Sequence, residues 1–316
     1  MEAQVSEQLQ YFLSKEGDVP FWDHPSMYGY KKLPKNSFPF INIEQALKAY
    51  RQGIFDDLDI TILKVVGDAI AANEDQLRRY LSTKTSRSDV SMRLERLRRN
   101  AMVDRWHCRL ENDENEEFKP PAPFTLGIGG FKLLKHFYND QPFVNPNTWD
   151  NQNAKSIQRY VAVNELRCRL VKSKAIKGWT WNGVVAHNRR YKKPLGVAEI
   201  ETGKGRVNFM IERAQMSQNF IGYLRDKLHQ WKQVFEANES FPIALFPNNV
   251  PIFVISCSTI SMAEFIHKQL MLDTYPFTVW LAVDELMDTE GTGKSFFAPD
   301  SEAIRRIHVS FLDNIE

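Results

Sequence analysis

The chain has 316 residues, of which 43% are hydrophobic and 25% are charged, and a formal net charge of +2. This composition is typical of a globular protein rather than a disordered or fibrous one, and the length predicts about two domains. No apolar run reaches the ~18 residues of a membrane span, and the first residues lack the pattern of a signal peptide. Three distant cysteines indicate neither a disulfide framework nor a zinc site, so we expect a cytoplasmic protein without a membrane partner.

Residues 1–57 contain many aromatic and turn-forming residues and predict an N-terminal extension. Within this extension, residues 45–51 have the pattern of a short helix. We expect the extension to pack on the domain that follows it or to bind a partner.

Residues 58–138 predict a winged helix-turn-helix domain. Ile60, Leu63, Val66 and Ile70 recur at helical spacing, and two further helical patterns follow. In chain order, the expected elements are a helix that begins at Asp59, a helix at 74–81, a polar turn at 82–86, a helix at 87–100, a strand at 102–110, an acidic loop at 111–123, a strand at 124–130 and a helix at 131–138. Three short helices and a hairpin are a common device for placing one helix in the major groove of DNA.

The helix at 87–100 has the pattern of a DNA-recognition helix. Its inward stripe consists of Val90, Leu94, Leu97 and Ala101, and its opposite face carries Ser88, Met92, Arg96 and Arg99. Between Arg78 and Arg109, ten basic residues stand against three acidic ones, a local net charge of +7. The expected DNA contacts are Arg78, Arg79, Lys84, Arg87, Ser88, Ser91, Arg93, Arg96 and Arg99.

Two alternatives to DNA binding remain open for this domain. The charged helix is also compatible with the solvated face of an ordinary helical bundle, and winged helices also serve as protein-binding modules. The loop at 111–123 carries five carboxylates, which phosphate repels, so we expect its tip to stay out of the groove or to meet a basic partner.

Residues 139–153 are rich in asparagine and proline and predict a linker, and residues 154–316 predict an α/β domain. The expected elements are helices at 156–171, 215–235 and 261–271 and strands at 195–201, 206–212, 244–245, 252–256 and 278–283. Between Lys155 and Lys193, eleven basic residues stand against one acidic residue, and Trp179, Trp181 and Tyr191 lie among them. This pattern predicts a second nucleic-acid surface with base stacking, or else a solvated helix beside two core tryptophans.

Glu212 and Lys227 are the leading candidates for chemistry in the α/β domain. Glu212 ends an expected strand, and Lys227 lies within the apolar stripe of the next helix, so the lysine needs a buried partner and Glu212 is the natural one. In a restriction-nuclease-like core, carboxylates hold Mg²⁺ and a lysine helps to polarise phosphate or water. Glu199 and Glu201 are weaker candidates, because residues 202–205 predict a hairpin turn that places them at the surface.

The order of these motifs resembles the replication-relaxation family of plasmid and mobile-element proteins. The resemblance rests on residues 126–134 (LGIGGFKLL), 193–196 (KPLG), 209–213 (FMIER) and 224–231 (LRDKLHQW), and it covers residues 58–285. It implies a winged helix, a restriction-nuclease-like C-terminal domain and a role in plasmid replication or in DNA relaxation and mobilisation. The family typically has aspartate at the positions of Leu195 and Ala214, so two expected carboxylates are missing here.

We therefore predict an α/β protein, α+β over the whole chain, in which a winged helix-turn-helix precedes a restriction-nuclease-like domain. The expected function is binding of double-stranded DNA in the replication, relaxation or mobilisation of a mobile element, or in its control. A replication protein, a relaxase or a second copy of the chain would be the protein partner. Neither a cofactor nor a metal is expected, and Glu212 and Lys227 form a buried ion pair in a catalytically inactive scaffold. The alternatives are a Mg²⁺-dependent nuclease and a protein-binding adaptor that uses the winged helix.

Overall fold

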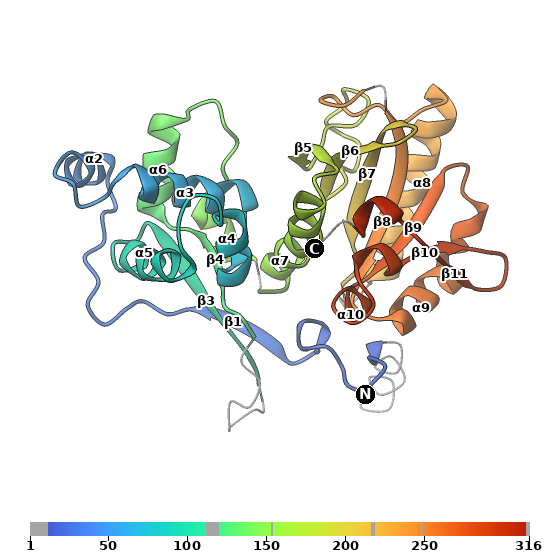
Figure 1. The fold of residues 1–316 in the computed structure, drawn as a ribbon, viewed down its shortest axis with the longest axis horizontal. Helices are drawn as coiled ribbons and strands as arrows, with labels where there is room; N and C mark the ends of the chain where they lie inside the picture. Colours follow the sequence, from blue (N-terminus) through green and yellow to red (C-terminus); the bar gives the residue numbers. More distant parts are fainter. Residues whose placement is uncertain (1–11, 112–119, 153, 216–218, 248, 314–316) are drawn as a thin grey trace. The chain divides into compact units, whose positions relative to one another are not determined.

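The computed structural model describes residues 12–111, 120–152, 154–215, 219–247 and 249–313, and it shows a mixed α/β protein with two sheets. The chain forms two compact units (Figure 1). The helical unit consists of Ser26–Cys168, and the sheet unit consists of Met1–Pro25 together with Arg169–Glu316. Among the described residues, no helix is both long and apolar enough to cross a membrane.

The helical unit combines helices with a small antiparallel sheet. Its helices are α2 (Ile43–Arg51), α3 (Asp57–Ala69), α4 (Glu74–Tyr80), α5 (Arg87–Arg99), α6 (Ile128–Phe137), the 3₁₀ helix η3 (Pro146–Asn151) and most of α7 (Ala154–Lys172). Its strands are β1 (Met27–Lys31), β2 (Ala72–Asn73), β3 (Val103–Leu110) and β4 (Pro123–Leu126), in the order β1-β3-β4-β2. All three pairings are antiparallel.

Helices α3, α4 and α5 start at polar side chains that cap their first turns. Asp56 and Asn73 form capping boxes with Asp59 and Gln76, and the Ser86 hydroxyl accepts a hydrogen bond from the backbone N–H of Asp89. The inward stripes of the three helices share one hydrophobic core with residues of β3 and β4. The structure confirms the helices that the sequence predicts at 59–70, 74–81 and 87–100. They could be predicted because caps and apolar stripes are local signals.

The N-terminal extension is divided between the two units. Strand β1 pairs with β3, and α2 covers the short helix expected at 45–51. Phe12, in contrast, belongs to the hydrophobic core of the sheet unit, and Asp23 accepts a hydrogen bond from Ser258 in that unit. The expectation that the extension as a whole packs on the following domain is therefore wrong for residues 12–25.

The sheet unit contains a seven-stranded sheet in the order β11-β10-β9-β8-β7-β6-β5. The strands are β5 (Ile176–Trp181), β6 (Gly196–Thr202), β7 (Gly205–Arg213), β8 (Val250–Cys257), β9 (Thr278–Val283), β10 (Phe296–Pro299) and β11 (Ile304–Ile307). The helical segments are η2 (Phe21–Asp23), α8 (Phe220–Asn238), α9 (Ile260–Leu270), η4 (Leu272–Thr274), α10 (Asp284–Met287), η5 (Thr292–Lys294) and η6 (Ser310–Leu312). The central pairs β7–β8 and β8–β9 are parallel, and the outer pairs are antiparallel.

Helices α8 and α9 connect the parallel strands and lie on one face of the sheet (Figure 1). Alternate residues of β7, β8 and β9, among them Met210, Phe253 and Val279, pack in one core with Trp231 of α8 and Ile266 of α9. The expected strand at 244–245 is wrong, since only isolated bridges form on either side of it. Strands β5, β10 and β11 were not expected from the pattern.

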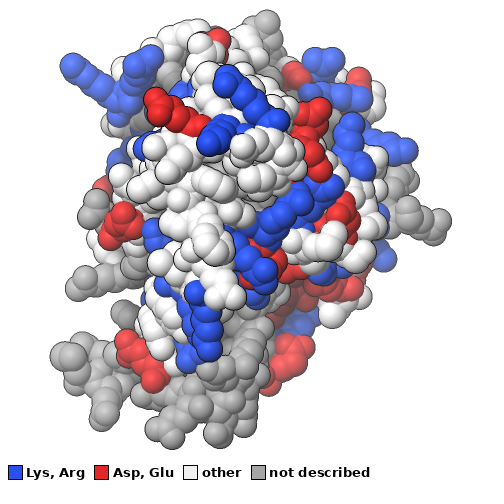
Figure 2. Space-filling view, turned by 90° about the vertical axis from the view of Figure 1, so that its left-hand side faces the viewer, with Lys and Arg blue, Asp and Glu red and all other residues white. Residues whose placement is uncertain are grey.

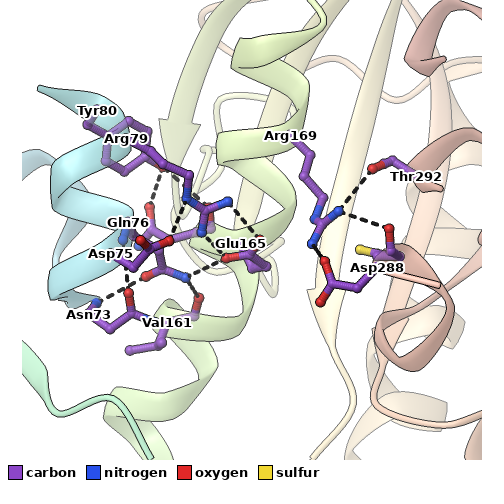
Figure 3. A network of polar contacts seen from close by, with 12 residues as sticks. Asn73, Asp75, Gln76, Arg79, Tyr80, Val161, Glu165, Arg169, Asp288 and Thr292 are labelled. Carbon is purple, nitrogen blue, oxygen red and sulfur yellow. Dashed lines mark hydrogen bonds and ion pairs between the residues drawn. The ribbon is translucent and has the colours of Figure 1, made fainter. Parts of the chain in front are cut away.

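Polar contacts place α7 with the helical unit, whereas the sequence pattern put a domain boundary at 139–153. The Gln76 side chain donates to the carbonyl of Val161 at 2.9 Å (Figure 3). Asn164 donates to the carbonyls of Ala69 and Ala71 at 2.8 and 2.9 Å. The asparagine-rich segment before α7 contains η3, in which Trp149 is buried. Residues 139–153 therefore have a composition typical of linkers but include a 3₁₀ helix with a buried tryptophan.

Candidate nucleic-acid interface

The outward face of α5 carries the side chains that the sequence assigns to DNA recognition. Val90, Leu94 and Leu97 are buried, as the periodicity predicts. On the opposite face, Ser88 is exposed, and Met92 has an exposed fraction of 66%. The side chains of Arg96 and Arg99 are 43% and 57% exposed, so this face is open to a macromolecular ligand.

Arg93 is committed to contacts inside the helical unit. Its Nη1 lies 2.7 Å from an oxygen of Asp56 and 3.1 Å from an oxygen of Asp59, and its Nε donates to Asp89 at 2.9 Å. The side chain is only 17% exposed. Arg93 therefore links α3 to α5, and the structure gives it a stabilising role in place of the expected DNA contact.

Arg96 contacts the same buried carboxylate from the surface. Its Nη2 pairs with Asp59, whose side chain is fully buried at the start of α3. Arg99 is held more loosely, with its Nε 3.3 Å from an oxygen of Glu95 on the same helix. Both guanidinium groups are partly exposed, so each retains N–H groups that a phosphate or a base can reach.

The arginines of α4 point toward partners within the unit. Arg78 donates to Ser91 at 3.1 Å and pairs with Glu74. Arg79 forms a two-pronged ion pair with Glu165 of α7 (Figure 3). Burial lowers the pKa of this guanidinium, but the hydrogen bonds that it donates to Glu165 more than offset that effect, so its pKa lies above the usual value and the group stays charged.

Arg87 has a carboxylate partner, whereas Lys84 has none among the described residues. Arg87 is 65% exposed and pairs with Asp75 at 2.6 Å. Lys84 is exposed, and the described part of the chain places no carboxylate within ion-pair distance of it. Of the nine expected DNA contacts, Arg78, Arg79, Arg93 and Ser91 serve internal contacts, while Lys84, Arg87, Ser88, Arg96 and Arg99 remain accessible.

The positive charge of this region is much smaller in three dimensions than along the sequence. Five carboxylates outside the window from Arg78 to Arg109 contact arginines within it, and Lys31 contacts Asp104, so the local net charge falls from +7 to +3. These carboxylates are Asp56, Asp59, Glu74, Asp75 and Glu165. Figure 2 shows basic and acidic side chains next to one another on the face that it displays. Long-range attraction of DNA is therefore weaker than the charge count along the chain predicts.

Acid is expected to weaken the contact between α3 and α5. Burial raises the pKa of the Asp56 carboxyl, but hydrogen bonds from Arg93 and from a backbone N–H more than offset this and lower it below its usual value of 3.8. Hydrogen bonds from Thr85 and Arg93 likewise lower the pKa of Asp89. Because both folded pKa values are lowered, these carboxylates stabilise the unit above the unfolded value, and that stabilisation is lost as the pH falls through 3.8 toward the folded values.

The measurement is the urea midpoint of the wild type and of Arg93→Ala from about pH 5 to about pH 3. The wild type should lose more stability across this range than the variant, because the variant lacks the partner that lowers both pKa values. Arg87→Ala, which removes an arginine that contacts neither carboxylate, is the control and should follow the wild type. Equal acid dependence of the wild type and Arg93→Ala would contradict the assignment.

The window of the expected second basic surface is divided between the two units, and its two tryptophans lie on the edge strand β5. Trp179 and Trp181 pack edge to face, with ring centroids 4.9 Å apart, and both are half-buried. The Trp179 ring covers Gly196 of the neighbouring strand, where a Cβ atom would lie within 2.7 Å of it. Lys177 pairs with Glu201 at 2.7 Å. The Trp179 ring therefore packs on the face of the sheet over β6 and against Trp181, which favours the structural alternative over base stacking.

Glu212 and Lys227 form the buried ion pair that the helical wheel predicts. The side chains are 1% and 3% exposed, and Lys227 Nζ contacts a carboxylate oxygen of Glu212. The ammonium group also donates to the Tyr223 hydroxyl at 3.1 Å and lies 5.3 Å from the centre of the Trp231 ring. A lysine that directly neutralises the carboxylate leaves it a poor ligand for a divalent cation.

Glu199 and Glu201 do not join Glu212. Glu199 pairs in register with Asn208, four residues before Glu212 on β7, a separation of about 13 Å along the strand. Its carboxylate accepts a hydrogen bond from Asn249 at 3.0 Å. Within the described residues, no three histidine, cysteine, aspartate or glutamate side chains gather as a metal site.

Arg213 is a buried polar residue that the sequence pattern did not single out. It follows Glu212 at the end of β7, and its Nη1 donates to the Ser256 hydroxyl at 2.9 Å and to Asp284 at 2.5 Å. These contacts join the carboxyl ends of β7, β8 and β9. The only signal for this role in the sequence is an arginine at the end of an otherwise apolar run.

Comparisons of this chain with protein-family models, with curated proteins and with solved structures found no match.

Proposed function

We propose that the chain is a DNA-binding protein and that residues 58–138 are its winged helix-turn-helix domain. The observation that carries the proposal is the outward face of α5, where Ser88, Met92, Arg96 and Arg99 are exposed on a scaffold of three helices and an antiparallel hairpin. A helix presented in this way fits the major groove. Lys84, before this helix, and Arg87, its first residue, can reach phosphates.

We further propose that the sheet unit is a restriction-nuclease-like scaffold without nuclease activity. The antiparallel strands β5, β6 and β7, followed by α8 and the parallel strand β8, match the order that we expect of such a core. The direct pairing of Glu212 with Lys227 supports an inactive site. The resemblance to the replication-relaxation family motivates a role in replication, relaxation or mobilisation of a mobile element, with a replication protein or a relaxase as partner.

Duplex-DNA binding at several salt concentrations tests this proposal. Each phosphate contact adds about 0.9 to the slope of log affinity against log salt concentration. Three accessible cations on and beside α5, together with Lys84, predict a slope of about −3 to −4. DNA incubated with Mg²⁺ should stay intact, and cleavage that Glu212→Gln abolishes would instead establish the nuclease.

One observation favours a protein-binding role as the second candidate. Leu33, Phe38 and Ile41 are 73%, 74% and 57% exposed, and Phe38 is hydrogen-bonded to the last turn of α5 through the Arg99 carbonyl. Exposed apolar side chains beside a nearly neutral helix suit a protein partner. A folded protein without salt-sensitive affinity for DNA would establish this candidate over the first.

A further inference from the structure

A pocket of about 360 Å³ lies entirely within the helical unit. Lys32 and Lys35, in the segment after β1, line one side of it. Arg98 and Arg99 of α5 and His107 of β3 line the rest. The volume falls at the lower end of the range of about 300–1,000 Å³ that is usual for small-molecule sites. None of these side chains except Arg99 belongs to the expected DNA contacts.

The lining of this pocket is more basic than its surroundings. It contains four lysine and arginine side chains and a single carboxylate, that of Glu95. Arg98 and Arg99 both contact Glu95 at 3.3 Å, whereas Lys32 and Lys35 have no ion pair within the described residues. The arginines of α4 and the middle of α5, in contrast, each contact a carboxylate. The lining therefore keeps a net positive charge that the carboxylate of Glu95 does not balance.

The pocket is held in shape by contacts between its walls. Arg98 is 12% exposed, and its Nη2 donates to the carbonyl of Lys32 at 2.7 Å. The N–H of Phe38 donates to the carbonyl of Arg99 at 2.9 Å. The His107 ring stacks on Tyr30 with centroids 5.7 Å apart. These contacts fix the backbone of the segment after β1 against α5 and hold the His107 ring in place, which lowers the entropic cost of binding.

His107 supplies a buried polar atom to this pocket. Its Nε2 is buried, and among the described residues nothing hydrogen-bonds to it. Such an atom in a native structure calls for a ligand, an ion or water. Burial lowers the pKa of His107, and the positive charges of Arg105, Arg98, Lys32 and Arg109 lower it further. The ring therefore lies where the potential is positive, and an anion beside it would favour its protonation.

We propose that this pocket binds a phosphate group through Lys32, Lys35, Arg99 and the Nε2 of His107. Phosphate carries the negative charge and the acceptor oxygens that complement this lining, in which Glu95 is the one carboxylate among the described residues. The source of the phosphate rests on the proposed function: since the pocket adjoins the C-terminal end of α5, the expected source is the DNA backbone beside the groove that α5 occupies. A free phosphate compound would use the same groups.

The titration of His107, followed by NMR in the full-length protein, tests the pocket without relying on DNA. Adding inorganic phosphate should raise the pKa of His107, while chloride at equal ionic strength should not. His107→Gln assigns the signal. Lys32→Ala with Lys35→Ala should reduce the phosphate-induced shift by at least half, whereas Lys48→Ala with Lys204→Ala, two exposed lysines outside the pocket, should not. A phosphate-independent titration in the wild type would overturn the proposal.

Duplex-DNA binding by the same variants separates the two sources of phosphate. If the DNA backbone fills the pocket, Lys32→Ala with Lys35→Ala should weaken binding about three- to tenfold and lower the salt slope by about one. Unchanged DNA binding together with loss of the phosphate response supports a free phosphate compound as the ligand and leaves the α5 assignment standing. A phosphate response in a protein that binds no duplex supports the pocket and overturns the proposed function.

Discussion

Replacement of Lys227 by methionine is expected to destabilise the sheet unit by about 3–5 kcal/mol. Methionine preserves most of the side-chain volume, so the loss comes from the Glu212 carboxylate, which stays almost fully buried without its counter-charge. The Tyr223 hydroxyl also loses a donor. The measurement is the free energy of unfolding in urea at neutral pH, followed by tryptophan fluorescence.

A double variant separates the ion pair from general damage to the core. Glu212→Gln combined with Lys227→Met removes both charges and should recover most of the stability that Lys227→Met loses, because a buried pair costs desolvation energy that neutral side chains avoid. Lys232→Met on the exposed side of α8, where the lysine is 43% exposed, is the matched control and should change stability by less than about 0.5 kcal/mol. Equal losses in the single and double variants would refute a net role for the pair.

The same variants bear on catalysis. If the sheet unit is a scaffold, they should change stability and leave duplex-DNA binding unchanged after correction for the unfolded fraction. If Glu212 were a metal ligand, Glu212→Gln would abolish Mg²⁺-dependent cleavage while the protein stays folded. The two readouts are independent, so each interpretation can fail alone.

Local signals in the sequence account for the elements that were predicted. The caps at Asn73 and Ser86 and the stripe of Val90, Leu94 and Leu97 act within a few residues, so periodicity located α4 and α5. The position of Lys227 within an apolar stripe likewise sufficed to predict its burial and its partner. The continuous apolar runs of β8 and β9 marked strands that are buried on both faces.

The sequence pattern does not predict β5, β10 and β11, which lie at or next to the edges of the sheet, and the reason is physical. Strand β5 lies at one edge of the sheet, is half-exposed, and contains Gly178 at a register shift, so it lacks both alternation and a buried apolar run. At the other edge, β11 and its neighbour β10 are four residues each. Short edge strands are specified by pairing with a neighbour rather than by their own pattern.

The electrostatics of the candidate interface depend on contacts distant in sequence. Arg96 meets Asp59 across 37 positions, and Arg79 meets Glu165 across 86. A charge count along a window contains the arginines and omits these carboxylates, so it overestimates the field. The basic pocket likewise depends on residues that are distant in sequence, since Lys32 is 66 positions from Arg98.

Arg96→Ala combined with Arg99→Ala is expected to weaken duplex-DNA binding by tenfold or more, about 1.4 kcal/mol or more. These arginines are the accessible cations on the outward face of α5, and the proposed function places both in the groove. The measurement is fluorescence anisotropy with a labelled duplex at fixed salt. Urea unfolding establishes that the variant is folded, since Asp59 loses one of its two arginine partners.

Two comparisons make this outcome specific to α5. Arg51→Ala with Arg305→Ala removes the same charge from exposed positions elsewhere and should change affinity less than twofold, a margin of about 0.4 kcal/mol. Asp75→Asn acts in the opposite direction, because it leaves Arg87 without its carboxylate partner and should strengthen binding about two- to threefold at low salt. If removal of a negative charge at Asp75 and removal of positive charges on α5 both left affinity unchanged in folded proteins, α5 would not face DNA. The exposed apolar segment around Phe38 would then be the surface to test with protein partners.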